Sequence, residues 1–446
     1  MAFERNLRTG KLARGAITGL AVAQAGVSHL GHRARQLTTD SDKKAAAQEQ
    51  HEADIGRILF RALNQLKGTA LKVSQLLSME VGVLPDGVRK ELAKGFYQVT
   101  PLNRALVHKV FRQEFGQTPE QLFSHFEPHS FAAASLGQVH HASLIDDQGA
   151  TMAVAVKVQY PGIAGSIASD MRLLRGILQT LSLTSDLMPR KSIIERVMND
   201  IEHKLAEEVD YLHEAAQLHW FHGNATLPGV VIPLPVESHS TRRVLTMQQL
   251  DGLHLDQWLA TEPDQAARNH YGQLLFDWFL HSAFELGRLH ADPHPGNFLF
   301  LPDGRLGLLD FGCTKQLSPS FVTRWTAAVQ AILHRPAGGA CDAVHQAYID
   351  LQLIAADMSL EDFTEELMPA VIPLQEWQME PFRSEYFDFA NKSPYPMLNP
   401  ADNKMLARHL ANILEELPYF DRAYMGLMHM LKKMDAVVCT KNRWIF

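Results

Sequence analysis

The sequence predicts an α+β protein in which a small strand-rich lobe precedes a larger helical lobe. Short apolar runs typical of strands are concentrated between about residues 126 and 250. From about residue 265 onward the apolar pattern is mostly helical, interrupted by a polar, glycine-containing stretch at 289–314. A chain of 446 residues can bury a large core and form more than one lobe.

The first 36 residues differ in composition from the rest of the chain. Six basic residues stand against the single acid Glu4, a net charge of +5, around the small-residue run GAITGLAVAQAGVSHLG. The alternatives are a secretory signal, a membrane-spanning helix, a helix lying on an anionic membrane surface, and a solvated extension. The run is poor in leucine and shorter than the about 20 apolar residues of a spanning helix, which favours the last two.

Residues 37–125 are expected to form an N-terminal helical subdomain. After a polar linker, apolar residues recur at helical spacing between residues 51 and 79: Ile55, Leu59, Leu63, Leu66, Ala70, Val73 and Leu77. Farther along, the runs SLGQVHHASLI, MAVAVKVQY, VVIPLPV and TRRVLTMQQL predict strands, and a long helical stretch covers about 191–222.

Composition excludes several broad classes. The 46% hydrophobic and 20% charged content is that of a folded globular protein. A net charge of −7 gives no general attraction to nucleic acid. The three cysteines, Cys313, Cys341 and Cys439, lie far apart in the sequence and fit a reducing, cytoplasmic compartment better than a disulfide framework.

Residues 289–314, LHADPHPGNFLFLPDGRLGLLDFGCT, predict a polar site at the end of a β-hairpin. The runs FLFL and LGLL flank an Asp-Gly pair, which is a strong two-residue turn signal. Pairing them would place Asp292 and Asn297, before the first strand, beside Asp310, after the second. Carboxylate and amide oxygens suit Mg²⁺ that is completed by substrate phosphates.

His290 and His294, four residues apart, also allow a zinc site. Pro293 and Pro295 disfavour a helix there, and no third nitrogen or sulfur ligand is evident. A buried histidine that orients a turn is the better interpretation of His290.

A lone lysine, Lys157, lies within the apolar run MAVAVKVQY, where its desolvation is costly without an anionic partner. Such a cation suits the phosphates of a nucleotide. Upstream, FAAASLGQVHHA predicts a turn of small residues that lets backbone amides approach phosphate.

In chain order, the small-residue turn, VAVK, an H-x-D-x₄-N loop and DFG resemble the protein-kinase signature set. More specifically, HADPHPGN, AAASLGQVH, EVDYLHEA (208–215) and KVSQ (72–75) resemble the UbiB family of atypical kinases, also called AarF-domain or coenzyme Q-associated kinases. The resemblance covers about residues 50–440. It implies a protein-kinase-like two-lobed fold with an added N-terminal helical subdomain, an N-lobe at 126–250 and a C-lobe at 251–446.

The resemblance implies roles for single residues. Asp292 falls at the catalytic-loop aspartate, Asn297 and Asp310 at the Mg²⁺ ligands, and Lys157 at the lysine that contacts the α/β-phosphates. Glu214 is the expected carboxylate partner of Lys157.

Further positions concern the nucleotide itself. The resemblance implies that Ala132, Ala133, Ala134 and Ser135 replace the glycine-rich phosphate loop of ordinary kinases. LTMQQLDG (245–252) resembles the hinge, with Met247 at the gatekeeper position and the Gln249 region offering backbone groups to adenine.

Lys72 and Gln75 match the KxGQ motif of the family, although Ser74 stands in place of its glycine. The resemblance implies that their helix covers the place where a protein kinase receives a peptide. Glu208 is the expected partner of Lys72, with Glu207 as the alternative. On a continuous helix Glu208 and Asp210 would point about 200° apart, so either the helix is distorted near residue 208 or only one motif acid reaches the site.

After DFG, only CTKQ precedes LSPSFVTRW, where Ser318 or Ser320 could cap a new helix. This leaves little room for a peptide-docking platform, and no Walker loop occurs. The expected function is therefore that of an Mg·ATP-binding atypical kinase or ATPase that supports ubiquinone or related isoprenoid-lipid metabolism.

The expected partners are ATP, a lipid or isoprenoid-quinone precursor or a lipid-bound biosynthetic complex, and an anionic membrane surface at the inner membrane face. The alternative is a nucleotide-gated lipid or protein binding module whose catalysis is vestigial. The presence of Lys157, Asp292, Asn297 and Asp310 together favours the enzyme.

Overall fold

The computed structural model describes residues 53–60, 63, 72, 73, 77, 88, 91, 102–134, 136–146, 148–184, 191–335, 341–396, 399–409 and 414–445. The basic segment 1–36, Gln75 and Ser135 lie outside the described residues. The chain divides into two compact units, the first comprising Met1–His213 with Val236–Met247 and the second comprising Glu214–Pro235 with Gln248–Phe446.

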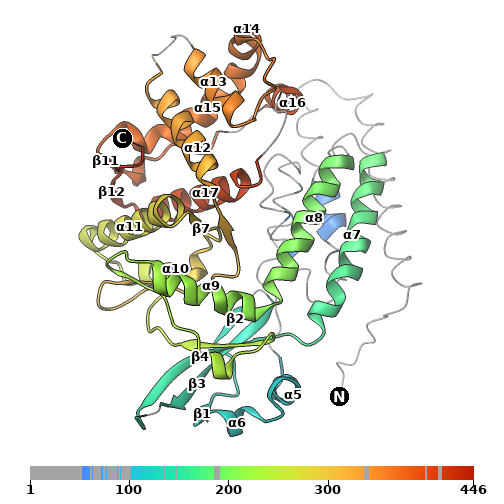
Figure 1. Ribbon diagram of the computed structural model, residues 1–446, viewed down its shortest axis with the longest axis vertical. Helices are drawn as coiled ribbons and strands as arrows, with labels where there is room; N and C mark the ends of the chain where they lie inside the picture. The colour runs from blue at the N-terminus through green and yellow to red at the C-terminus, as the bar shows by residue number, and fades with distance from the viewer. Residues whose placement is uncertain are drawn as a thin grey trace. The chain divides into compact units, whose positions relative to one another are not determined.

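The first unit contains a five-stranded sheet in the order β1-β3-β4-β6, with β2 pairing with β3 (Figure 1). Its strands are β1 (His125–Phe126), β2 (Ala132–Ala134), β3 (Gly137–Ile145), β4 (Thr151–Gln159) and β6 (Val244–Gln248). β3 and β4 form the long antiparallel hairpin, with Gln138 opposite Val158. The strands predicted at SLGQVHHASLI and MAVAVKVQY are therefore confirmed.

One face of this sheet is covered by α5 (Arg104–Phe115) and the short α6 (Pro119–Leu122). The side chains of α5 pack against alternate residues of β4, namely Val154, Val156 and Val158. Because side chains alternate across a strand, Lys157 points toward the opposite face.

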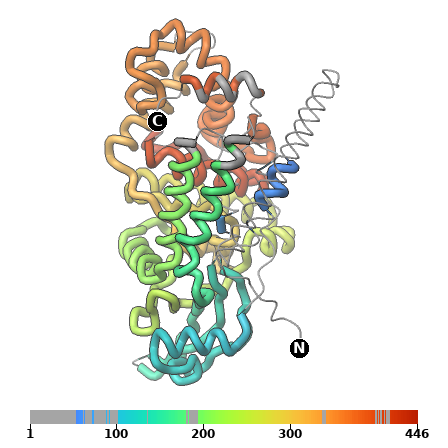
Figure 2. Tube along the Cα trace, turned by 90° about the vertical axis from the view of Figure 1, so that its right-hand side faces the viewer, coloured from blue at the N-terminus to red at the C-terminus, as the bar shows by residue number. Residues whose placement is uncertain are grey.

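The long helices α7 (Ile163–Thr184) and α8 (Lys191–Glu208) lie side by side (Figures 1 and 2). Their apolar faces form a core with the predicted N-terminal helical stripe, of which the described residues Ile55, Leu59, Leu63, Val73 and Leu77 are all buried. The prediction is confirmed at these positions; Leu66 and Ala70 lie outside the described residues.

The single helix expected over about 191–222 is instead two helices. α8 ends at Glu208, and α9 (Tyr211–Asn224) begins three residues later. Asp210 caps α9, because its Oδ1 accepts a hydrogen bond from the Leu212 N–H at 3.2 Å. The distortion expected as one possibility near residue 208 is present.

The second unit is mainly helical. Its helices are α10 (Leu255–Leu259), α11 (Gln265–Leu280), α12 (Pro319–Leu333), α13 (Asp342–Asp350), α14 (Leu360–Asp362), α15 (Met368–Met379), α16 (Pro400–His409) and α17 (Leu417–Met434). α11 and α17 lie side by side in its interior (Figure 1). Ser318 caps α12 by accepting from the Phe321 N–H, as the sequence predicted.

Short strands position the polar loops of the second unit. β8 (Phe298–Phe300) and β9 (Leu306–Leu308) are antiparallel, and β5 (Val230–Val231) pairs with β9 in parallel. β7 (Arg288–His290) pairs with β10 (Thr314–Gln316), and β11 (Tyr386–Asp388) with β12 (Val437–Cys439). The predicted hairpin is confirmed, but its turn spans Pro302, Asp303 and Gly304, with Gly304 at φ 84°, rather than Asp-Gly alone.

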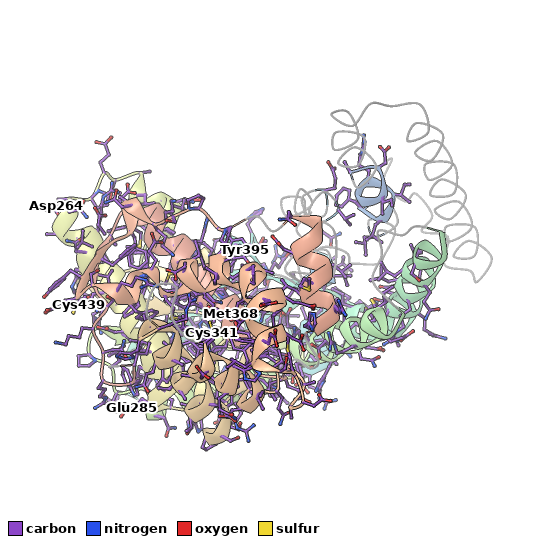
Figure 3. All side chains as sticks on the ribbon, turned by 90° about the horizontal axis from the view of Figure 1, so that it is seen from above. Asp264, Glu285, Cys341, Met368, Tyr395 and Cys439 are labelled. Carbon is purple, nitrogen blue, oxygen red and sulfur yellow. The ribbon has the colours of Figure 1, made fainter. Side chains whose placement is uncertain are left out.

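None of the three cysteines forms a disulfide bond; Cys341 and Cys439 lie well apart (Figure 3). Among the described residues, no helix has both the length and the apolar composition needed to cross a membrane.

Candidate active site

In the first unit, Lys157 lies in the middle of β4 and is buried. Its Nζ lies 5.1 Å from the centroid of the Tyr211 ring, a cation–π contact with the first residue of α9. Glu214, the expected carboxylate partner, is buried on α9 and comes one helical turn after Tyr211. Lys157 is thus a desolvated cation against the start of the helix that contains Glu214.

Steric crowding explains why glycine stands at position 137 in the motif AAASLGQVH. A Cβ at Gly137 would lie 2.4 Å from the Val158 carbonyl oxygen and 2.7 Å from Tyr211 Oη. Only glycine therefore lets β3, β4 and Tyr211 approach so closely beside Lys157. No role for Tyr211 was predicted from the sequence, although this residue lies within the motif EVDYLHEA.

Ala132, Ala133 and Ala134 precede Gly137 and form the strand β2 rather than the predicted turn; all three are partly or fully exposed. In its register with β3, Ala134 pairs with Gly137 and Ala133 with Gln138. The side chains of β2 are small, as the expected approach of a phosphate to this segment requires.

The same motif also contains two buried polar side chains, Gln138 and His140. The Gln138 amide donates to His140 Nε2 at 2.8 Å, and the other nitrogen of the ring donates to the Glu127 carbonyl at 2.9 Å. Burial lowers the pKa of His140, so the ring is neutral in this network. These two side chains hold the hairpin in place through their buried hydrogen bonds.

Lys72 of the KVSQ segment forms an ion pair with Glu208, the last residue of α8. The two side chains are only 6% and 11% exposed. Glu207, the alternative partner, instead lies 3.9 Å from His203 and is 39% exposed. Glu208 is therefore the partner of Lys72.

The segment expected to be the hinge follows β6. Met247 is buried in this strand. In the second unit, Gln249 Nε2 donates to Asp251 Oδ1 at 2.8 Å, and the Gln248 N–H donates to the Leu234 carbonyl at 3.0 Å.

The β8–β9 hairpin brings the expected metal ligands to the same end of two paired strands. Phe298 lies opposite Leu308, and the Leu309 N–H donates to the Asn297 carbonyl at 3.0 Å. Asn297 and Asp310 thus stand at neighbouring positions, as the pairing of the two apolar runs predicted. Asn297 Nδ2 donates to the Asp292 carbonyl at 3.2 Å, so the amide oxygen is the atom with which this side chain could coordinate a cation.

His290 orients the turn that contains Asp310. Its Nε2 donates to the Asp310 backbone carbonyl at 2.7 Å, and the ring is buried beside Phe311. Burial lowers the pKa of His290 below its ordinary value, which keeps the ring neutral. His294 is exposed and accepts from the Gly296 N–H at 3.0 Å. The interpretation of His290 as a turn-orienting histidine is confirmed.

The oxygen donors of Asn297 and Asp310 fit Mg²⁺. Asp310 Oδ1 accepts from the Gly312 N–H at 2.9 Å, which orients the carboxylate. Among the described residues, no group of three or more His, Cys, Asp or Glu side chains forms a metal cage. An amide and a carboxylate that leave most coordination positions to phosphate and water are typical of a Mg²⁺ site.

Two further residues of the second unit, Gln217 and Arg422, contact this region and were given no role from the sequence. Gln217 Oε1 of α9 accepts hydrogen bonds from Arg288 of β7 at 3.3 Å and from Thr314 of β10 at 3.2 Å. Arg422 of α17 donates to the Ala291 carbonyl and to Cys313 Sγ. No local pattern marks such contacts, because the partners are far apart in the chain.

The strand-rich unit with its buried lysine, and the helical unit with its Asp-Asn-Asp loops, define a protein-kinase-like fold. The family described as the ABC1 atypical kinase-like domain matches residues 95–341. The chain belongs to this family.

Its relatives include mitochondrial atypical kinase COQ8B of Danio rerio, 28% identical over 401 residues, covering 88% of this chain and 61% of that protein. A chloroplastic aarF domain-containing protein kinase of Arabidopsis thaliana is 28% identical over 336 residues, covering 72% and 59%. The protein sll0005 of Synechocystis is 29% identical over 309 residues, covering 68% and 43%. The alignments thus span 43% to 61% of these relatives' own lengths.

A solved structure shows the same fold. The complex of Rv3197 with erythromycin from Mycobacterium tuberculosis superposes with a TM-score of 0.59 at 24% identity, covering 90% of this chain and 96% of that one.

Proposed function

We propose that the protein binds Mg·ATP and acts as an atypical kinase or ATPase on water or on a small, lipid-like acceptor. The observation that supports this most directly is the β8–β9 hairpin, which holds Asn297 and Asp310 at adjacent positions beside the loop of Asp292. The proposal requires that Lys157 of the first unit acts on the same nucleotide. Family membership supports the same reading.

In this proposal, each of the expected site residues has a role in binding or reaction of the nucleotide. Lys157, paired with Glu214, binds the α- and β-phosphates, and Ala132–Ala134 with Ser135 approach them through backbone amides. Met247 and Gln249 border the adenine. Asp292 accepts the proton of the attacking hydroxyl or water as the bond from the γ-phosphorus to the bridging oxygen breaks and ADP leaves. Mg²⁺, when bound by Asn297 and Asp310, neutralises the phosphate charge.

The nature of the acceptor follows from the chain after Asp310. Only Phe311–Gly312–Cys313, β10 and Leu317 intervene before Ser318 caps α12. A protein kinase uses a long segment at this point to bind its peptide substrate, so a small or lipid-like acceptor is favoured. Since one relative is named atypical kinase COQ8B and the motifs resemble those of coenzyme Q-associated kinases, we propose a role in isoprenoid-quinone metabolism at a membrane surface.

The test compares Asp310→Asn with Asp303→Asn, which makes the same change at the exposed tip of the same hairpin. Nucleotide binding with and without Mg²⁺ is measured by calorimetry, and phosphate release by a coupled assay with and without anionic liposomes. Asp310→Asn should abolish the Mg²⁺ dependence of binding, whereas Asp303→Asn should behave as wild type. Unchanged Mg²⁺-dependent binding in Asp310→Asn would refute the metal assignment. Binding without any phosphate release would favour the nucleotide-gated binding module.

A further inference from the structure

Helix α17 contacts both loops of the proposed active site through one side chain, Arg422. Its Nε donates to the carbonyl of Ala291, the residue before Asp292, at 3.0 Å. Its Nη2 donates to Cys313 Sγ at 2.7 Å, and Cys313 follows the Asp310–Gly312 turn. The helix spans Leu417–Met434 and lies outside the residues 95–341 that match the family.

The two loops touch each other at the same point. The Ala291 N–H donates to the Cys313 carbonyl at 3.0 Å, one position beyond the β7–β10 pair His290 and Thr314. This backbone hydrogen bond uses the N–H of Ala291 and the carbonyl of Cys313. The carbonyl of Ala291 and the sulfur of Cys313 instead accept hydrogen bonds from Arg422. Arg422 supplies both donors, because a planar guanidinium presents several N–H groups in a fixed fork.

One turn farther along α17, Gly426 brings the helix backbone against the same loop. A Cβ at Gly426 would lie 2.2 Å from both Cβ and Cγ of Pro293, the residue after Asp292. Arg422 and Gly426 are four residues apart and so share a face of the helix. This face follows the catalytic loop from Ala291 to Pro293.

The surroundings of Arg422 favour the charged form of its guanidinium group. Burial alone would lower the pKa of its guanidinium, but charge interactions with Cys313 and Asp292 raise that pKa above its ordinary value. The side chain is therefore a cation that is held in place against the two loops by its hydrogen bonds to Ala291 and Cys313.

We propose that Arg422 is a positioning residue, which holds the backbone before Asp292 and the segment after Asp310 in the one arrangement that phosphoryl transfer requires. This inference rests on the proposed function for its catalytic consequence, but not for the structural link between the two loops.

The variants are Arg422→Lys, which keeps the charge without the fork, and Arg422→Ala, with Lys433→Ala as control. Lys433 lies on the same helix, and its ammonium pairs with Asp256. Hydrogen–deuterium exchange of peptides covering residues 288–297 and 310–316 is measured without nucleotide. Both Arg422 variants should exchange faster in these two peptides than wild type, and Lys433→Ala should not. If Arg422→Ala does not fold, Arg422→Lys decides.

Kinetics then separate positioning from general stability. In Arg422→Lys, kcat for phosphate release should fall about 10- to 100-fold with KM for ATP unchanged, as for other groups that orient a ligand residue. Wild-type exchange in both peptides, or faster exchange with wild-type kcat, would overturn the inference. Wild-type behaviour of Arg422→Lys in both measurements would show that charge alone suffices and would overturn it as well. A wild-type protein that binds no nucleotide would instead overturn the proposed function, while the exchange data would still decide whether Arg422 holds both loops.

Discussion

Lys72 and Glu208 form an ion pair whose side chains are 6% and 11% exposed, at the point where α8 ends. The pair links the KVSQ segment to the start of EVDYLHEA, two motifs that lie far apart in the sequence. Because Asp210 begins a new helix, Glu208 does not have to share a face with Asp210 to reach Lys72. A buried pair is costly to break, since either charge alone would remain desolvated.

Replacing Lys72 with Ala should therefore destabilise the protein by about 3–5 kcal/mol, because Glu208 is left uncompensated. Adding Glu208→Gln to Lys72→Ala should restore much of this loss. The control is Arg57→Ala, which breaks the exposed pair with Asp54 and should cost about 0–1 kcal/mol. Urea unfolding measures the free energy of unfolding of wild type and of these three variants.

Lys72→Ala also tests whether Lys72, which was predicted to act with Gln75, restrains the proposed site. If it does, Lys72→Ala should change nucleotide preference or turnover under conditions where the variant stays folded. A stability loss no larger than that of Arg57→Ala would contradict the buried pair. Kinetics identical to wild type would leave Lys72 with a structural role only.

Stability should depend on pH through Asp421 of α17. Burial raises the pKa of Asp421 to about 7, from an ordinary value of 3.8. Between these values the unfolded chain has released the proton that the folded protein retains. The free energy of unfolding therefore falls as pH rises from about 4 to about 7, and this contribution is constant above the folded pKa.

Asp421→Asn cannot ionise, so it should gain stability relative to wild type as the pH is raised from about 5 to about 8. Urea midpoints at the two pH values measure the effect. Asp350→Asn, the same change at an exposed position on α13, is the control and should show no such gain. A constant difference between Asp421→Asn and wild type across this range would show that the pKa of Asp421 is not raised in solution.

The basic segment 1–36, which lies outside the described residues, should give the chain a salt-sensitive affinity for anionic membranes. Each basic residue near such a surface contributes about 1 kcal/mol, and screening acts within about 10 Å at 0.1 M salt. Flotation with cardiolipin-containing and neutral vesicles should recover the full chain on the anionic vesicles only, and a chain beginning at Leu37 on neither. Equal flotation of both chains would move the membrane contact elsewhere, and no flotation of either would leave a solvated extension.

Local patterns in the sequence predicted much of the fold and several of the polar residues of the candidate site. The stripe that includes Ile55 and Leu77, the hairpin of β3 and β4, and the approach of Asn297 to Asp310 all follow from periodicity and strand pairing. Lys157 could be singled out because a charge inside an apolar strand is costly. These are signals that act over a few residues.

Other features depend on contacts that no local pattern contains. The break between α8 and α9 requires Asp210 to act as a cap, although its spacing from Glu207 and Glu214 also fits one continuous helix. The contact of Tyr211 with Lys157 and that of Arg422 with Ala291 join distant parts of the chain. Only the folded chain shows that a residue of the last long helix touches the loop of Asp292.

The close packing of Gly426 on Pro293 has a practical consequence for expression of the protein in pieces. The matched family region ends at residue 341, yet the surface that packs against the loop of Asp292 belongs to α17. A fragment cut at the family boundary would expose the Pro293 ring and the Ala291 carbonyl to solvent. For this protein the smallest portion worth purifying extends through β12 and ends near Ile445.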